Sequence, residues 1–198
     1  MNVAKINVSE HRKPDHDVLP VFVSRWSPRA LQPGVSRADL SRLLEAARWA
    51  PSSYNEQPWR YLFAVSGTPE FNTFLGFLLE ANQVWAKNAG ALLLLVAKKT
   101  FARNGKPNGV AVFDAGSSWQ NLALQGASMG LAVHAMAGFD AAKAASTLGV
   151  PEDFHPCCMI AVGKPGEVET LPADYQGIEK PSPRNPITAF AFEGRWKA

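Results

Sequence analysis

Residues 50–60 read APSSYNEQPWR, and at this stretch the pattern of the chain changes from a helix to a strand. Its two prolines restrict the backbone, and its hydroxyl and amide side chains offer hydrogen bonds without a charge at its centre. A rigid, polar loop between two hydrophobic elements would suit the wall of a site for a flat heteroaromatic ligand that carries carbonyls and ring nitrogens.

The helix that precedes this loop is predicted by its capping residues and its apolar spacing. Ser36 and Asp39 form the pattern of a capping box. Apolar residues then recur at helical spacing, at Leu40, Leu43, Leu44 and Ala47. Pro51 disfavours helical geometry at Ala50 and so ends the helix. Residues 59–65, which follow the loop, predict a strand.

Other elements follow from the same kinds of signal. We expect helices after Thr68 and Pro69, over residues 110–129 with Gly130 as the stop, and after the cap Asp140. We expect strands at residues 91–97, 131–136, 157–162 (followed by a turn at 163–166) and 187–192. We expect residues 100–109 to form a polar loop that shapes access to a site. We expect residues 167–186 to form an extended arm, because this segment is too long and polar for an internal connection.

Composition limits the class of protein. The chain has 198 residues, of which 46% are hydrophobic and 19% charged, with a formal net charge of +3. This is typical of one globular domain. Lysine and arginine are scattered rather than clustered, which disfavours a nucleic-acid partner. Residues 1–17 lack an apolar signal segment and the apolar run 89–97 is too short to cross a bilayer, so we expect a cytoplasmic protein without a membrane partner.

We predict no metal site from the cysteines and histidines. Cys157 and Cys158 are neighbours in a strand, where side chains alternate between faces, so we expect buried core cysteines. The four histidines show no metal-ligand spacing. Among them His134 lies in an apolar strand, and we expect it to be a hydrogen-bonded core residue.

Small residues in the 110–129 helix permit another element to approach closely; they are Ala115, Gly116, Ala123, Gly126 and Ala127. The pattern leaves open whether that element belongs to the core or to a second subunit.

Residues 25–29, RWSPR, could form a compact anion-binding loop. Arg25 and Arg29 are four residues apart with Ser27 between them, and Pro28 stiffens the backbone. Arginine and hydroxyl donors are suited to a phosphate. Taken alone, this spacing is more often that of solvated surface arginines.

Taken together, these segments resemble a known family. Residues 51–59 are similar to the Pro-Ser-Ser-x-Asn-x-Gln-Pro-Trp signature of FMN-dependent nitroreductases, and the resemblance extends over residues 18–196. RWSPR followed by ARWAPSS resembles the subgroup of flavin reductases and nitroreductases linked to desulfurisation. The resemblance implies an α+β fold with a mixed, mainly antiparallel central sheet flanked by helices. It also implies an intertwined homodimer in which the C-terminal arm, residues 167–198, crosses to the partner. Residues 18–198 would form one FMN-binding domain after a flexible tail, residues 1–17.

The resemblance also implies which residues contact FMN. Arg25 and Ser27 match contacts to the phosphate and ribityl chain, with Trp26 between them in the same cofactor-binding segment, and Arg29 matches a basic residue at the N1/C2 edge of the ring. A second set of residues comes from the partner subunit: Pro51, Ser52, Ser53 and Asn55. The remaining matches are Asn82 at the pyrimidine edge, the backbone of Ala137 and Gly138 near N5 and O4, and Arg184 at the phosphate. Asn82 could instead be a helix cap, Gln57 could be a ring contact or a turn former, and the register of Lys180 as a second phosphate contact is open.

The activity that the resemblance implies is oxidation of NADH or NADPH through flavin N5, with hydride passed to a nitroaromatic, a quinone or free flavin. No catalytic side chain is assigned, because the flavin carries the chemistry and Arg29 tunes its ring. The alternatives are a non-catalytic FMN-binding module, a structural dimer without flavin, or a reductive dehalogenase; the sequence shows no obvious tyrosine, glutamate and lysine clamp for the last.

Overall fold

A computed structural model describes residues 6–196 of the chain. Its helices are α1 (Pro20–Ser24), α2 (Arg37–Arg48), α3 (Pro69–Leu75), α4 (Glu80–Ala86), α5 (Ala111–Ser128), α6 (Ala141–Thr147) and α7 (Ala173–Gln176). Its strands are β1 (Leu31–Gln32), β2 (Trp59–Val65), β3 (Ala91–Lys98), β4 (Ala132–Met136) and β5 (Phe154–Pro165). Four short 3₁₀ helices are η1 (Val8–Glu10), η2 (Ser53–Asn55), η3 (Val168–Thr170) and η4 (Ile187–Ala189). The ends of the predicted tail and arm, residues 1–5 and 197–198, lie outside the described residues.

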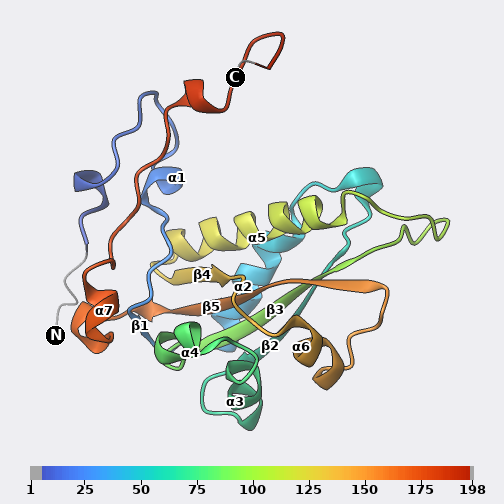
Figure 1. The fold of residues 1–198 in the computed structure, drawn as a ribbon, viewed down its shortest axis with the longest axis horizontal. Coiled ribbons are helices and arrows are strands. Elements are labelled where there is room, and N and C mark those ends of the chain that lie inside the picture. The colour runs from blue at the N-terminus through green and yellow to red at the C-terminus, as the bar shows by residue number, and fades with distance from the viewer. Residues whose placement is uncertain (1–5, 197–198) are drawn as a thin grey trace.

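The sheet is built around β5, the longest strand. It pairs antiparallel with β1, β3 and β4, and β3 pairs antiparallel with β2. Helices lie on both sides of this sheet (Figure 1). The expected α+β class is therefore confirmed, and every ladder within residues 6–196 is antiparallel.

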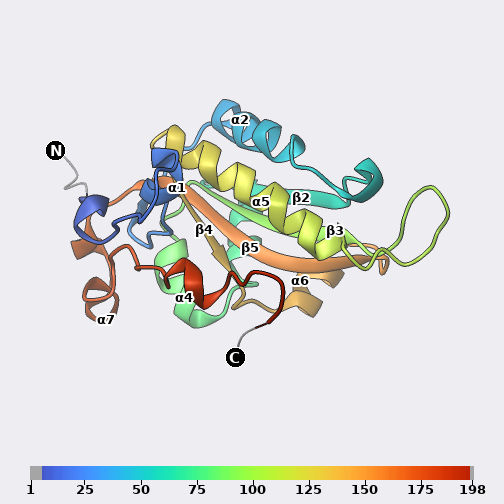
Figure 2. The same cartoon turned by 90° about the horizontal axis from the view of Figure 1, so that it is seen from above.

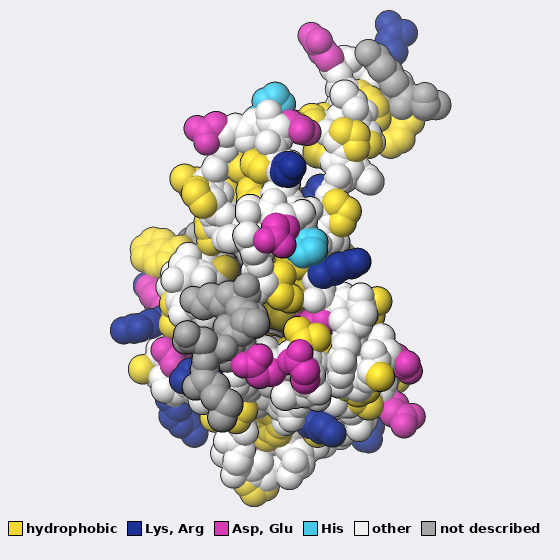
Figure 3. All heavy atoms as spheres, turned by 90° about the vertical axis from the view of Figure 1, so that its left-hand side faces the viewer, with side chains coloured by type: hydrophobic (Ala, Val, Ile, Leu, Met, Phe, Trp, Pro, Cys, Tyr) yellow, Lys and Arg dark blue, Asp and Glu magenta, His cyan; other side chains and the backbone are white. Residues whose placement is uncertain are grey.

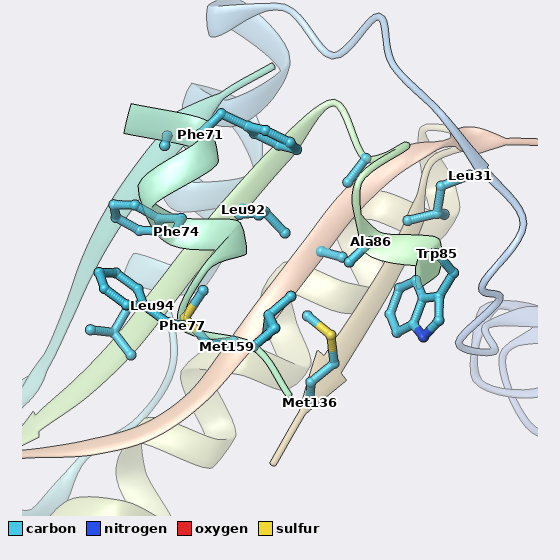
Figure 4. Close-up of a cluster of buried hydrophobic side chains, with 14 of the residues drawn as sticks. Leu31, Phe71, Phe74, Phe77, Trp85, Ala86, Leu92, Leu94, Met136 and Met159 are labelled. Atoms are coloured by element: carbon cyan, nitrogen blue, oxygen red, sulfur yellow. The ribbon is translucent and has the colours of Figure 1, made fainter. Parts of the chain in front are cut away.

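Strand β3 separates two hydrophobic cores because its side chains alternate between the two faces of the sheet. Leu92, Leu94 and Val96 belong to a core that contains α3, α4 and Ala144 of α6 (Figure 4). Leu93 and Leu95 belong to a second core, which is formed with α2 and α5. Both faces of β3 are covered, as its uninterrupted aliphatic sequence predicts.

Local signals set several element boundaries as expected. The Ser36 hydroxyl accepts from the Asp39 amide while Asp39 accepts from the Ser36 amide, which completes the predicted capping box. Asp140 caps α6 by accepting from the Lys143 amide at 2.9 Å. Strand β2 has the bounds that the sequence predicts.

The predicted turn at residues 163–166 is wrong. Strand β5 continues through Pro165, and Pro165 and Lys164 pair with Leu31 and Gln32 of β1. The glycine there serves close backbone approach, because a Cβ on Gly163 would lie 2.9 Å from the Gln32 carbonyl oxygen.

The two cysteines also depart from expectation. The ladder pairs Leu95 with Cys158 and Val96 with Pro156, so Cys157 is the extra residue of a β-bulge. A bulge breaks strand alternation. Both cysteines therefore pack against the same core, and both are only partly buried. Burial raises the pKa of Cys157 to about 11 and that of Cys158 to about 12, so both are protonated thiols at neutral pH.

The prediction of a final strand at residues 187–192 is also wrong, because these residues form no strand in the single chain that the structure describes. This segment contains η4, and it lies with the N-terminal segment in a projection beyond the sheet (Figure 1). A strand needs a neighbour to pair its backbone groups, and the segment has no sheet of its own chain beside it. Arg12 joins the two terminal segments, because its Nε donates to the Ser182 carbonyl at 2.8 Å and its Nη1 to the Val23 carbonyl at 2.9 Å.

Candidate functional site

The RWSPR loop runs from α1 to β1 and is held against the sheet by a half-buried histidine. His134 of β4 has its Nδ1 3.0 Å from the Pro28 carbonyl oxygen, and its ring lies 4.7 Å from that of Trp85 in α4. Burial lowers the pKa of His134, which favours a neutral imidazole whose Nδ1–H donates to that carbonyl. The expected hydrogen bond of His134 is confirmed, although its side chain is only partly buried.

Three arginines gather beside this loop. Burial lowers the pKa of Arg25, and the nearby charge of Arg184 lowers it further. The pKa of Arg12 is lowered by burial and by both of these cations. The Arg12 Nη1 also donates to the Arg25 carbonyl at 2.6 Å, and the Arg25 Nη1 lies 3.5 Å from the Ser27 hydroxyl.

This cluster has the character of an anion site. Within residues 6–196 the ion pairs are Arg29 with Glu179 and Arg48 with Glu45, so no carboxylate neutralises the three arginines. Mutually repelling cations that are held together favour an anion among them. Arg12 and Arg184 line a hollow of about 550 Å³ on the projection, together with Lys13, two histidines, the carboxylate of Asp15 and apolar side chains. Basic, acidic, histidine and apolar side chains are mixed on this face (Figure 3). Sequence reasoning missed Arg12, because it matches no motif and reaches the others only through the fold.

Trp26 lies on another side of the loop. With Arg25 and Pro28 it lines a cavity of about 390 Å³, which is bounded by the C-terminal end of α5 and the start of β4. Ala127, one of the small residues in α5, also lines this cavity.

Arg29 has a different partner, which the sequence did not reveal. Glu179, from the C-terminal arm, is buried, and its Oε1 accepts from the amides of Arg29 at 2.6 Å and Ala30 at 2.8 Å. Its Oε2 lies 3.7 Å from the Arg29 Nη1, which is close enough for ion pairing but too long for a hydrogen bond. This distance explains why Oε2 is buried without a hydrogen-bond partner.

A tyrosine of the arm links the loop to α4. The Arg29 guanidinium lies 5.9 Å from the Tyr175 ring centre, and the Tyr175 hydroxyl donates to the Ala81 carbonyl at 2.7 Å. Residues 175–179 therefore hold both the Arg29 backbone and the segment that carries Asn82.

Asn82 and the turn after β4 meet directly. The Asn82 Nδ2 donates to the Gly138 carbonyl at 3.0 Å, and a Cβ on Gly138 would lie 2.7 Å from that nitrogen. Gly138 is thus required for close approach. The N-cap of α4 is Leu79, so the alternative that Asn82 caps the helix is wrong. Ala137 is exposed beside this contact.

The loop at residues 51–57 is held in a strained conformation. Tyr54, Asn55 and Gln57 have φ values of 53°, 55° and 49°, which non-glycine residues rarely adopt. The Ser53 amide donates to the buried Asp114 carboxylate at 3.1 Å, and the Gln57 amide donates to the Ser52 hydroxyl at 3.0 Å. Strain that the surroundings maintain in this way is typical of functional loops.

The polar loop at residues 100–109 is fastened to this strained loop. The Ala102 amide donates to the Glu56 carboxylate at 2.7 Å. The Arg103 guanidinium lies 3.8 Å from the Tyr54 ring centre, and the Phe101 ring meets Tyr54 edge-on at 6.0 Å. The two loops therefore form one edge of the molecule.

One chain does not bring all the predicted site residues together. The RWSPR loop, Asn82 and the turn at Gly138 lie at one end of the sheet, and Arg184 lies in the projection beside them. The loop at 51–57 lies at the opposite end, near the start of α5, in both views (Figures 1 and 2). A single chain therefore carries two separate parts of the predicted site.

Comparison with known proteins points to one family. The Nitroreductase family matches residues 23–70 and 63–164. A solved structure described as an oxidoreductase containing FMN is 36% identical, with a TM-score of 0.90, and the match covers 94% of this chain and 96% of that one. A putative nitroreductase from Desulfovibrio desulfuricans, solved in complex with FMN, is 23% identical with a TM-score of 0.70, over 93% of this chain and all of that one, and shows the same fold.

Two curated relatives are similar over shorter stretches. An uncharacterized 15.4 kDa protein of Mycolicibacterium smegmatis is 33% identical over 64% of this chain and 84% of its own length. A putative NAD(P)H nitroreductase of Bacillus subtilis is 34% identical over 41% of this chain and 39% of its own length. Within residues 6–196, no helix has the length and apolar character needed to cross a bilayer.

Proposed function

Because this chain belongs to the nitroreductase family, we propose that it is an FMN-dependent oxidoreductase that accepts hydride from NADH or NADPH and passes it to a flat, electron-poor acceptor. The observation that carries the proposal is the cluster of Arg12, Arg25 and Arg184, which has no neutralising carboxylate within the described chain. A phosphomonoester, with nearly two negative charges at neutral pH, suits such a cluster.

The remaining residues suit the rest of an FMN molecule. Ser27 would contact the phosphate and ribityl chain beside Arg25. Arg29 and Asn82 would face the pyrimidine edge of the ring, and the backbone of Ala137 and Gly138 would face N5 and O4. When bound, FMN supplies the hydride chemistry at N5. The protein's part is then to hold the ring, exclude water from it and place a cation where charge accumulates on reduction.

We further propose that the complete site needs two copies of the chain. The second wall, Pro51, Ser52, Ser53 and Asn55, lies too far along the molecule to reach the RWSPR loop of its own chain (Figure 1). Exposed apolar side chains support an interface: Phe113 on α5 is 75% exposed and Phe190 in the arm is 68% exposed. In this arrangement the arm crosses to the partner, where residues 187–192 could pair with a sheet.

The acceptor would be a nitroaromatic, a quinone or free flavin. The edge formed by Tyr54, Phe101 and Arg103 would lie at the mouth of the partner's site and meet such planar rings. The narrower resemblance to flavin reductases linked to desulfurisation remains a prediction of the sequence.

The test is spectroscopic. Purified protein should carry or bind FMN and be yellow, and NADH or NADPH should bleach it without oxygen. An anaerobic stopped-flow comparison of the two nicotinamides, followed by a panel of oxidants, would then identify donor and acceptor. A colourless protein that does not bind added FMN would overturn the proposal, whereas a yellow protein that neither nicotinamide bleaches would favour a non-catalytic FMN-binding module.

A further inference from the structure

We infer that Glu179 is a positioning residue that holds Arg29 against the RWSPR loop and offsets its charge at the flavin. The inference rests on the proposed function, because it assigns a role to the residue that would face the reducible edge of FMN. Glu179 lies 150 residues from Arg29 in the sequence, in the arm, and is brought to it only by the fold.

The two oxygens of Glu179 have separate roles. Oε1 accepts from two consecutive amides, those of Arg29 and Ala30, and so fixes the backbone at the end of the loop. Oε2 makes no hydrogen bond and faces the Arg29 guanidinium at 3.7 Å. One oxygen therefore sets geometry while the other acts through charge.

Burial makes the charge effective. The Glu179 side chain has no exposed surface, whereas that of Arg29 is 29% exposed. A carboxylate that water does not screen reduces the positive potential that its partner presents elsewhere. Arg29 would favour the anionic reduced flavin, and Glu179 would oppose this preference in part. The reduction potential of bound FMN would then lie between the value set by an unpaired Arg29 and the value without that cation.

Two substitutions separate geometry from charge. In Glu179→Gln the side-chain oxygen can still accept from both amides, but the negative charge is gone. In Glu179→Ala both contributions are lost. Glu169→Gln, an exposed glutamate of η3 in the same arm, is the matched control for loss of one negative charge at a distance.

The expected result is an order of midpoint potentials for bound FMN. Glu179→Gln leaves the charge of Arg29 uncompensated, so the midpoint potential of FMN bound to this variant should be more positive than in wild type. The affinity for reduced relative to oxidised FMN should rise about tenfold, which corresponds to about 30 mV for a two-electron couple. Arg29→Ala should be more negative than wild type. In the double variant, which combines Arg29→Ala with Glu179→Gln, positions 29 and 179 again have no net charge, so the midpoint potential should return close to that of wild type. The midpoint potential of Glu169→Gln should equal that of wild type.

A second readout needs no flavin. Hydrogen exchange of the Arg29 and Ala30 amides in the FMN-free protein should remain slow in Glu179→Gln and become fast in Glu179→Ala. Fast exchange in wild type would overturn the assigned geometry. Potentials of Glu179→Gln at or below wild type would overturn the charge role. A wild-type protein that binds no FMN would instead refute the proposed function while leaving the exchange result to judge the positioning role.

Discussion

At the scale of single residues, the arginines near the RWSPR loop differ in what surrounds them. Arg29 has a buried carboxylate 3.7 Å away, whereas Arg25 forms no ion pair within residues 6–196 and lies near the Arg184 cation and the Ser27 hydroxyl. The first arrangement is nearly neutral and the second attracts an anion. We therefore expect Arg29 to influence the electronic state of a ligand and Arg25 to influence how tightly its anionic part is held.

Replacing Arg25 with alanine should loosen FMN but not riboflavin, which lacks the phosphate. Loss of one charge-assisted hydrogen bond, about 1.5–3 kcal/mol, predicts a dissociation constant for FMN that is roughly 10- to 150-fold higher. Fluorescence titration of the apoprotein with both flavins measures this. Arg37→Ala, an exposed arginine in the first turn of α2, is the control. An equal loss for both flavins would show that Arg25 does not act through the phosphate.

His134 should make the fold less stable in mild acid. Burial lowers its pKa in the folded state, so between that pKa and about 6.5 the unfolded chain binds more protons. Stability then rises with pH, by at most about 1.4 kcal/mol per pH unit from this group, and is lost as pH falls below about 6.5. His134→Asn can still donate to the Pro28 carbonyl but does not titrate. Urea unfolding of the apoprotein from pH 5 to 7 should show a shallower slope for this variant, and identical slopes would contradict the prediction.

At the scale of elements, the small residues of α5 lie in different surroundings: some are buried against the core and others are exposed. Ala115, Ala123 and Gly126 are buried against the core, which includes α2. Gly116 is exposed, and a Cβ there would meet nothing within 4 Å. The sequence left core and subunit boundary as alternatives, and the structure assigns most of these residues to the core while leaving Gly116 on the exposed face beside Phe113.

Gly126→Ala should destabilise the protein, although alanine is the better helix former. Its Cβ would lie 2.5 Å from the Val133 Cγ2, and overpacking of this kind costs about 1–3 kcal/mol, more than the 0.5–1 kcal/mol gained in helix propensity. We expect a net loss of up to about 2.5 kcal/mol in the free energy of unfolding, measured in urea. Ser128→Ala, an exposed position in the last turn of α5, should change it by less than about 0.5 kcal/mol. A stabilised Gly126→Ala would show that β4 can move away at no cost.

At the scale of the whole molecule, each end of the sheet carries a different part of the predicted FMN site. One end carries the arginine cluster, Arg29 and Asn82, and the other carries the strained loop at 51–57 with its tyrosine and phenylalanine edge. A projection made of both termini extends from the first end (Figure 1). A symmetric dimer would bring each end of one chain to the other end of its partner.

Phe113→Asp should therefore weaken the dimer and flavin binding together. A charge in the middle of an apolar interface is desolvated without a partner, so we expect monomers in sedimentation and at least tenfold weaker FMN binding at micromolar protein. Thr73→Asp, an exposed position of α3 on the opposite face of the sheet, should leave the oligomeric state unchanged. A Phe113→Asp protein that is monomeric yet binds FMN as tightly as wild type would show that one chain is sufficient.

Local sequence determined where several elements begin and end. The capping box at Ser36, the cap at Asp140 and the aliphatic run of β3 depend on neighbours in the chain, so their physical causes are visible in the sequence itself. Residues 25–29 could be proposed as an anion-binding loop from their own spacing, whereas the roles of Asn82 and Gly138 came from the resemblance to a known family.

Only the tertiary structure decided the contacts between distant segments. Arg12 reaches Arg25, and Glu179 reaches Arg29, through the path of the two terminal segments, which no local pattern encodes. The extension of β5 depends on pairing with β1, and the fate of residues 187–192 depends on whether a sheet lies beside them. Backbone pairing and the burial of charge are properties of what surrounds a residue in space. For that reason the sequence determined the candidate ligand-binding segments, and the fold alone determined which charges stand beside them.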